Sequence, residues 1–304
     1  MVEVSVCVMS YNFEKYISQT LNSVLSQNTD FDFEIIVCDD GSNDNTPLIL
    51  KEYQNKYPDL IKLVLLSENT KGKLTVIKAL EKASGKYIAL LEGDDFWCND
   101  NKLQMQFDYM EKHPDMSAVV THLNSVNENG EEIKMPKHWQ SNIDKDVFSI
   151  KDFERHPISP FVQSLFYRNK SIYFDTIRSW CRMDNCVQAM LLYDGNIGIL
   201  SDVTATYRIV RFKGNNFSSK PIYAKAQVLF DNAMLIKKYF GDKINMDYLI
   251  EGYLADLLLF GYKHLSVEQK EYYKNLSIKR KIGLVVRAIN ESIIQRFINI
   301  IVRA

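Results

Sequence analysis

The first 125 residues alternate between short apolar runs and segments of helical periodicity, and this alternation restricts the fold more than any other feature. Valine occupies every second position from Val2 to Val8, which is typical of a β-strand. Further strand-like runs cover residues 34–38, 61–66, 87–91 and 117–121, and helical patterns separate them. The alternation predicts right-handed crossovers and a mostly parallel sheet with helices on both faces.

Polar segments follow three of the predicted strands at the point where each strand ends. They are Ser10-Tyr11-Asn12, Asp39-Asp40-Gly41-Ser42 and Glu92-Gly93-Asp94-Asp95. In an open parallel sheet, ligands bind beyond the carboxyl ends of the strands, where the strand order reverses. The sequence therefore predicts a binding site at this edge, with two acidic segments in it.

The acidic segments favour a metal-assisted nucleotide site. A dinucleotide-binding sheet has glycines in its first strand-to-helix turn, whereas residues 9–16 contain none. Carboxylates repel a bare diphosphate unless a divalent cation lies between them, and oxygen ligands suit Mg²⁺ or Mn²⁺. The alternative is that Asp94 and Asp95 only cap the next helix, and residues 39–42 alone are also compatible with an ordinary turn. The agreement of three segments at one edge favours the binding site.

Several separated motifs resemble the family 2 glycosyltransferases in order and spacing. They are VSVCVMSYNFEKYISQTLNSVLSQ from Val4, FEIIVCDDGSNDNT from Phe33, ASGKYIALLEGDDFW from Ala83 and KLQMQ from Lys102. This resemblance covers about the first 125 residues well and continues more faintly through residues 155–218. It implies the GT-A fold, which is an α/β, Rossmann-like, mostly parallel sheet flanked by helices. It also implies a nucleotide-sugar donor and inversion at the anomeric carbon.

The resemblance assigns donor-binding roles to the first two polar segments. It implies that Tyr11 and Asp40 recognise the base, normally uracil, and that Ser10, Asn12 and Asp39 shape the pocket.

The third segment occupies the DXD position of the family. The resemblance implies that Asp94 is the principal metal ligand, with Asp95 beside it. Two residues depart from the family pattern: Glu92 replaces the first aspartate, and Lys78 stands where many relatives have asparagine. The longer Glu92 side chain can reach the ribose or a metal-bound water, so its partner at the donor stays open.

An inverting transfer requires a general base that takes the proton from the acceptor hydroxyl. Relatives keep this base as an aspartate some 90 residues beyond DXD, before an apolar helix and a strand ending in Tyr-Arg. Asp184 matches that position, because an apolar helical pattern, a turn around Gly195 and Gly198, and Tyr207-Arg208 follow it. The alternative is that Asp184 only caps its helix.

Acceptor contacts are expected from residues 155–168, where His156 and Gln163 are the candidates, although a structural histidine is the commoner outcome. The loop 211–219 offers Arg211 and Lys213 for the donor diphosphate, and a solvated loop is the alternative. The donor sugar is not specified by these patterns.

The chain after about residue 222 has a continuously helical pattern. Its last segment carries six basic residues against Glu291 alone, namely Lys279, Arg280, Lys281, Arg287, Arg296 and Arg303. A basic amphipathic helix can lie in an anionic membrane interface. A helical bundle packed on the catalytic domain, or a homodimer contact, is the alternative.

Composition restricts the partners and the compartment. A net charge of -1 gives no electrostatic argument for nucleic acid as a partner. Five cysteines form an odd set, and Cys7 and Cys38 lie in apolar runs, so we expect free thiols in a reducing compartment. Neither an export signal nor an apolar run of about 18 residues is recognised. We therefore expect a cytoplasmic protein, associated peripherally with the inner face of the membrane if the basic tail binds there.

The expected organisation is a donor-binding half at 1–125, an acceptor-binding half at 126–218 and a helical extension at 219–304. The expected activity is a metal-dependent, inverting transfer from a nucleoside diphosphate sugar, normally UDP, to a glycan or lipid-linked glycan hydroxyl. The setting would be the assembly of bacterial surface polysaccharide. A non-catalytic glycan-binding or assembly module is one alternative. A glycoside hydrolase also needs paired acids, but it does not explain why they follow parallel strands.

Overall fold

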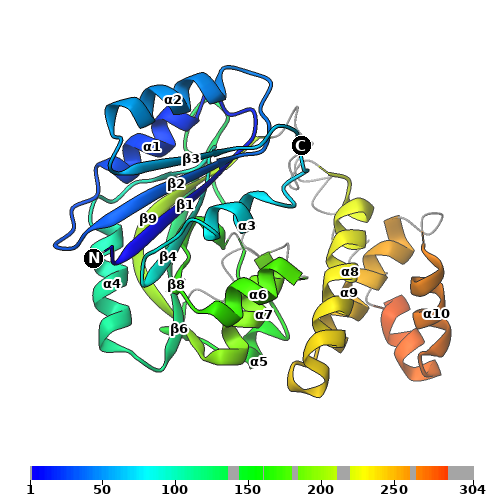
Figure 1. Cartoon of the computed structure of the whole chain (residues 1–304). Coiled ribbons are helices and arrows are strands. Elements are labelled where there is room, and N and C mark those ends of the chain that lie inside the picture. The colour runs from blue at the N-terminus through cyan, green and yellow to red at the C-terminus, as the bar shows by residue number, and fades with distance from the viewer. Residues whose placement is uncertain are drawn as a thin grey trace. The chain divides into compact units, whose positions relative to one another are not determined.

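The computed structural model describes residues 2–135, 144–159, 161–179, 184–210, 220–260 and 265–286. The chain forms two compact units, Met1–Ile209 and Val210–Ala304 (Figure 1). The division of the first unit into two halves stays a prediction.

A single sheet forms the core of the first unit. Its strands are β1 Val4–Ser10, β2 Phe33–Asp39, β3 Ile61–Leu65, β4 Tyr87–Glu92, β5 Phe96–Trp97, β6 Met116–Asn127, β7 Val147–Phe148, β8 Phe166–Arg168 and β9 Asn196–Ile209. The order is β3-β2-β1-β4-β8-β6-β9-β5, and β7 pairs with β9. Neighbours from β3 to β4 are parallel, as are β6 and β9, whereas β8 is antiparallel to both β4 and β6. The prediction of a mostly parallel α/β sheet is confirmed.

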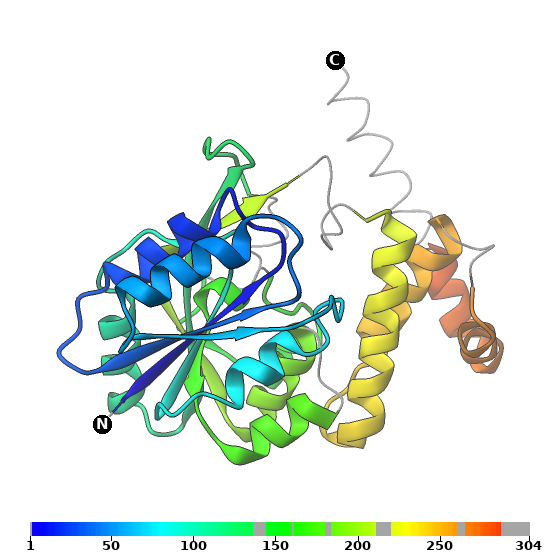
Figure 2. The ribbon, with the colours of Figure 1, turned by 45° about the horizontal axis from the view of Figure 1, so that its top comes forward.

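Helices cover the sheet as the alternation predicts. Those of the first unit are α1 Ile17–Leu25, α2 Thr46–Lys56, α3 Thr75–Leu80, α4 Lys102–Lys112, α5 Ile150–Phe153, α6 Ser171–Ser179 and α7 Asp184–Asp194, with a 3-10 turn η2 at Val162–Ser164. Figure 2 shows α1 and α2 on one face of the first strands and α3 on the other. All seven residues of β1 are buried, because this strand lies in the interior of the sheet and is covered on both faces.

Gly198 corrects the expectation of a turn around residues 195–198. Strand β9 already begins at Asn196, and Gly198 pairs with Val119 of β6. A Cβ atom at Gly198 would lie 2.4 Å from the ring of Tyr109 on α4. The glycine is therefore used for close packing between strand and helix, a role that its sequence context does not distinguish from a turn.

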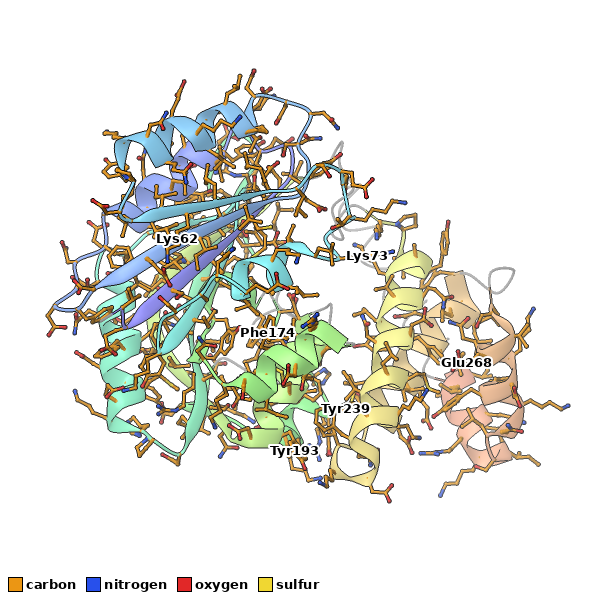
Figure 3. The ribbon with its side chains drawn as sticks, in the orientation of Figure 1. Lys62, Lys73, Phe174, Tyr193, Tyr239 and Glu268 are labelled. Atoms are coloured by element: carbon orange, nitrogen blue, oxygen red, sulfur yellow. The ribbon has the colours of Figure 1, made fainter. Side chains whose placement is uncertain are left out.

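The second unit is helical. Its elements are α8 Ile222–Phe240, the 3-10 turn η4 Gly241–Lys243, α9 Asp247–Phe260 and α10 Val267–Asn275, and residues 278–286 are also helical. Helices α8 and α9 pack along each other (Figure 1). Across the described ranges, none of the helices combines the length and apolar character that crossing a bilayer requires. Figure 3 labels Tyr239 of α8, whose side chain is exposed, and Glu268 at the start of α10.

Candidate functional site

The loops after β1 and β2 are joined by hydrogen bonds that the sequence did not predict. The Asn12 backbone N–H donates to Ser42 Oγ at 2.8 Å, and Asn43 N–H donates to Asn12 Oδ1 at 2.8 Å. Asn12 adopts a φ of 56°, a left-handed conformation that asparagine tolerates better than most residues. These bonds bring the first two polar segments together at the carboxyl edge of the sheet.

Asp39 and Asp40 are both buried, and both hold loops in place. Asp39 accepts hydrogen bonds from the Ser42 N–H at 2.9 Å and from Ser42 Oγ at 2.5 Å. Asp40 accepts from the N–H and hydroxyl of Thr70, at 3.0 and 2.6 Å, and from Gly72 N–H at 2.8 Å. These donors order the loop between β3 and α3, where Figure 3 labels Lys73. The expected contact of Asp40 with the base stays a prediction.

Three further donor-site candidates lie at the end of β1, in the loop after it and on α3. Tyr11 is half-buried in the loop after β1. Ser10 Oγ is buried and, within the described residues, has no hydrogen-bond partner. Lys78 lies on α3, where its ammonium group forms an ion pair of 2.7 Å with Glu81.

Gly93 fixes the place of the acidic segment at the end of β4. Its N–H donates to the Met9 carbonyl at 2.8 Å, and a Cβ atom there would approach that carbonyl and the Phe13 ring to 2.9 Å. A side chain at this position would push the chain away from β1. The glycine thus keeps the segment after β4 close against the end of β1.

Asp95 is buried, and each of its carboxylate oxygens accepts a hydrogen bond. Its Oδ1 accepts from the Arg208 backbone N–H, and its Oδ2 accepts from Gln163 Nε2, both at 2.6 Å. Gln163 is itself buried in η2, so the structure places this acceptor-site candidate beneath the acidic segment. Metal ligation by Asp95 would have to compete with these two bonds.

Arg208 of β9 is hydrogen-bonded to the acidic segment at residues 92–95, and we call this set of bonds the clamp. Its buried guanidinium donates to the carbonyls of Asp94 at 2.8 Å and Asn127 at 3.2 Å. A third bond of 2.7 Å goes to Gln19 Oε1 on α1, and the Tyr16 ring lies 4.4 Å from the guanidinium carbon. The sequence marked Tyr207-Arg208 as a family pattern but gave no indication of this role.

A second buried basic residue, Lys102, packs against Trp97, an aromatic residue that follows the acidic segment. Lys102 is fully buried; its ammonium lies 4.5 Å from the centre of the Trp97 ring and donates to Gln106 Oε1. Burial lowers the pKa of Lys102 to about 7. Trp97 Nε1 donates in turn to the Gln163 carbonyl at 3.1 Å. Gln163 thus links Trp97 to Asp95, to which its own side chain donates.

Asp184 is the first residue of α7 and interacts electrostatically with the end of β4. Desolvation raises the pKa of Glu92 to about 8, and the charges of Asp94 and then Asp184 add to the rise. Coulomb effects between charges weaken with distance, so Asp184 lies near enough to Glu92 for their charges to interact. Both interpretations of Asp184, as general base and as helix cap, stay predictions.

The environment also raises the pKa of Asp94 and Asp184. The pKa of Asp94 rises to about 6, mainly by desolvation, and the Arg208 charge offsets part of the rise. Asp184 is exposed as a residue. Desolvation of its carboxyl group by the surrounding protein nevertheless raises its pKa to about 6. Its own backbone N–H acts in the opposite direction. The charges of Asp94 and Asp184 in turn raise the pKa of Glu92, and a divalent cation would relieve that repulsion.

The donor set fits a cation that the substrate helps to bind. In the described ranges, no group of three or more His, Cys, Asp or Glu side chains is already arranged to hold a metal ion. Asp94 is buried, and among described residues only its own backbone N–H binds its carboxylate. One protein carboxylate together with substrate phosphates is a common arrangement for Mg²⁺.

Three predicted residues lie on an exposed loop or outside the described ranges. His156 is on an exposed loop after α5. Arg211, with Lys213, falls outside the described residues.

Solved structures establish the class of fold. The chain superimposes on Staphylococcus aureus TarS 1–349, crystallised with UDP-GlcNAc, with a TM-score of 0.61 over 94% of this chain and 79% of that one, at 20% identity. The mannosyltransferase PcManGT of Pyrobaculum calidifontis, in complex with GDP-Man and Mn²⁺, gives a TM-score of 0.59 over 96% and 87%, at 14% identity. The fold is therefore that of the GT-A glycosyltransferases.

Sequence comparison then gives the family. The profile described as Glycosyl transferase family 2 matches residues 5–174, which is more than half of the chain. The chain belongs to this family, and the resemblance seen in the motifs is confirmed.

Individual relatives match over part of their length. An uncharacterised glycosyltransferase of Methanocaldococcus jannaschii is 31% identical over 68% of this chain and 70% of its own. An uncharacterised Mycobacterium tuberculosis protein is 30% identical over 67% of this chain, and the match spans only 58% of that relative. The Escherichia coli UDP-Glc:alpha-D-GlcNAc-diphosphoundecaprenol beta-1,3-glucosyltransferase WfgD is 40% identical over 41% of this chain and 47% of its own.

Proposed function

We propose that the chain is an inverting glycosyltransferase that moves a sugar from UDP to a hydroxyl of a glycan or lipid-linked glycan in surface-polysaccharide assembly. The observation that carries the proposal is that the charges of Asp94 and Asp184 both act on Glu92 at the carboxyl edge of the sheet. WfgD, named for a UDP-glucose donor and a diphosphoundecaprenol-linked acceptor, supports this choice of substrates. TarS, crystallised with UDP-GlcNAc, supports a UDP-sugar.

Asp94 is the residue we propose for holding Mn²⁺ or Mg²⁺, because the carboxylate of Asp95 is already bonded to Arg208 and Gln163. When bound, the cation would neutralise the negative charge that grows on the leaving diphosphate. The complex of PcManGT with Mn²⁺ supports metal use in this fold. Asp95 and Arg208 position the segment that carries Asp94.

Asp184 is the proposed general base. Its carboxylate takes the proton from the acceptor hydroxyl while that oxygen attacks the anomeric carbon from the face opposite the diphosphate. A pKa of about 6 leaves Asp184 ionised near neutral pH and makes it a stronger base than an ordinary aspartate. Solvent exposure of its surface gives an acceptor access to it.

The remaining residues shape the donor and acceptor sites. Tyr11 would stack on the base, and Ser10 would offer its unpartnered hydroxyl to the donor. Glu92 would contact the ribose or a water of the cation. His156 is proposed at the acceptor entrance, whereas Gln163 acts from below through Asp95. A site of action at the inner face of the cell membrane would suit a lipid-linked acceptor.

The experiment compares Asp184→Asn and Asp94→Asn with the unmodified chain in a screen of UDP-sugars with Mn²⁺ and a lipid-linked acceptor. Asp184→Asn should retain UDP binding in a calorimetric titration, while transfer falls about 10²–10⁴-fold, as expected for loss of a general base. Asp94→Asn should lose the Mn²⁺ dependence of UDP binding. The exposed Asp202, changed to Asn, is a matched control that should leave both measurements unchanged.

Full transfer by Asp184→Asn would remove it as the base, and unaltered Mn²⁺-dependent binding by Asp94→Asn would remove the metal assignment. If neither nucleotide nor cation binds the unmodified chain, a non-catalytic module becomes the better description.

A further inference from the structure

The helix formed by residues 278–286 exposes an apolar strip on the second unit. The strip consists of Ile278, Ile282, Val285 and Val286, whose side chains are 77%, 59%, 45% and 51% exposed. With about 100° of rotation per residue, these four positions fall within one arc of roughly 100° on the helix surface. Exposed apolar residues scattered singly are normal, but a continuous strip on one helix is not.

The opposite side of this helix is the one that packs on its own unit. Leu284 is 2% exposed. Arg280 reaches back to α9, where its guanidinium pairs with Asp247 at 2.8 Å and Glu251 at 2.9 Å. Ser277 precedes the helix and caps its start, because its Oγ accepts the Arg280 N–H at 3.3 Å and its carbonyl accepts the Lys281 N–H at 2.9 Å. The orientation of the helix within its unit is thus fixed, and the strip points away from the packed side.

Lysines border the strip on both sides. By the same helical geometry, Lys279 follows Val286 around the surface, and Lys281 lies beside Val285 on the other flank. Lys279 is exposed, and Lys281 is held by a bond of 2.8 Å to the Lys274 carbonyl. An apolar strip between two cationic borders matches the order of acyl chains and anionic headgroups at a bilayer surface.

We propose that the strip binds the surface of an anionic lipid bilayer, with Lys279 and Lys281 at the level of the headgroups. From Ser277 to Ala304 the sequence has six basic residues and one acidic residue, which complements an anionic surface. The same charge disfavours a second copy as the occupant, because a two-fold contact would place like charges opposite each other. The proposal does not depend on sugar transfer.

The test is co-sedimentation of the full chain with phosphatidylcholine vesicles, with or without phosphatidylglycerol, at low and high salt. The unmodified chain should sediment with the phosphatidylglycerol vesicles only, and less so at high salt. Ile278→Asp and Ile282→Asp should each weaken binding by about tenfold or more, because a charge replaces an inserted side chain. Lys279→Glu should weaken binding and reduce its dependence on salt.

Val267→Asp is the matched control, since Val267 is 82% exposed on α10 outside the strip, and its binding should be unchanged. Circular dichroism should show the same helix content for all variants. Failure of the unmodified chain to bind, or an equal loss in Val267→Asp, would overturn the proposal. It would also be overturned if Ile282→Asp converted a dimer into a monomer in light scattering while vesicle binding stayed the same.

Discussion

Replacement of Arg208 by lysine tests whether the acidic segment is held by the clamp from β9. The guanidinium makes three side-chain hydrogen bonds, to the Asp94 carbonyl at 2.8 Å, the Asn127 carbonyl at 3.2 Å and Gln19 Oε1 at 2.7 Å. An ammonium group on a single stem can reach about one of these acceptors. Two bonds are then lost, while the charge and the hydrogen bond from the Arg208 backbone to Asp95 are retained.

The magnitude follows from the bonds that are lost. A hydrogen bond from a charged donor contributes about 1.5–3 kcal/mol net, so two such bonds give about 3–6 kcal/mol. The Asn127 bond is long and Gln19 can turn toward water, so we expect a loss of about 2–4 kcal/mol. For a unit of this size, each 1 kcal/mol lowers the melting temperature by about 2–4 °C, which predicts a decrease of roughly 4–16 °C.

The assay is thermal unfolding followed by circular dichroism, with UDP and Mn²⁺ titrated into the folded variant in parallel. Arg155→Lys is the control, because Arg155 is exposed and the same exchange there should leave the melting temperature unchanged. A melting temperature of Arg208→Lys equal to that of the unmodified chain would refute the clamp as a stabilising element.

Three further predictions follow from the same geometry. Because Asp184 must be ionised to accept a proton, kcat/KM should rise with pH through about 6 and level off above it; a flat profile from pH 5 to 8 would contradict its role. Gly93→Ala should destabilise the chain by about 1–3 kcal/mol in urea unfolding and weaken UDP binding, because the added methyl group would lie 2.9 Å from the Met9 carbonyl; Gly130→Ala, which has open space but a positive φ, separates packing from backbone strain. Burial lowers the pKa of Lys102 to about 7, so between about pH 7 and 10 the unfolded chain binds one proton more than the folded chain. The free energy of unfolding should therefore rise with pH over that range, by up to about 1.4 kcal/mol per pH unit. Lys102→Met should remove that rise, and an identical slope in urea unfolding would contradict the assignment.

The sequence predicted the parts of the fold whose signal is local. Strands β1, β2 and β4 are buried along almost their whole length, and such strands appear as continuous apolar runs. Strand β5 was less visible, because it has two residues and is defined by its partner strand. Phe96 and Trp97, for example, pair with Thr206 and Ala205 of β9.

The sequence also predicted where acidic residues gather, since each follows a strand that it could identify. It could not predict which of them a protein donor already satisfies. Asp40 and Asp94 look alike as acids after strands, yet Thr70 and Gly72 bind the carboxylate of the first, whereas the second has only its own backbone N–H among described residues. The difference is set by the path of the loop after β3, which no local pattern encodes.

The distribution of hydrogen bonds separates the acids that build the site from those available to a ligand. Asp95 is bonded to Gln163 and Arg208, which lie 68 and 113 positions further along the chain, and these bonds favour a positioning role. Burial raises the pKa of Glu92, Asp94, Asp184 and also Asp95, but the carboxylate of Asp95 in addition accepts the hydrogen bonds from Gln163 and Arg208. A cation beside Glu92, Asp94 and Asp184 would therefore relieve unfavourable charge, whereas a cation at Asp95 would have to displace hydrogen bonds that the fold uses. A cation that arrives with a diphosphate could therefore bind near Glu92, Asp94 and Asp184 without breaking the hydrogen bonds of Asp95. This is the physical reason for proposing catalysis at the carboxyl edge of the sheet.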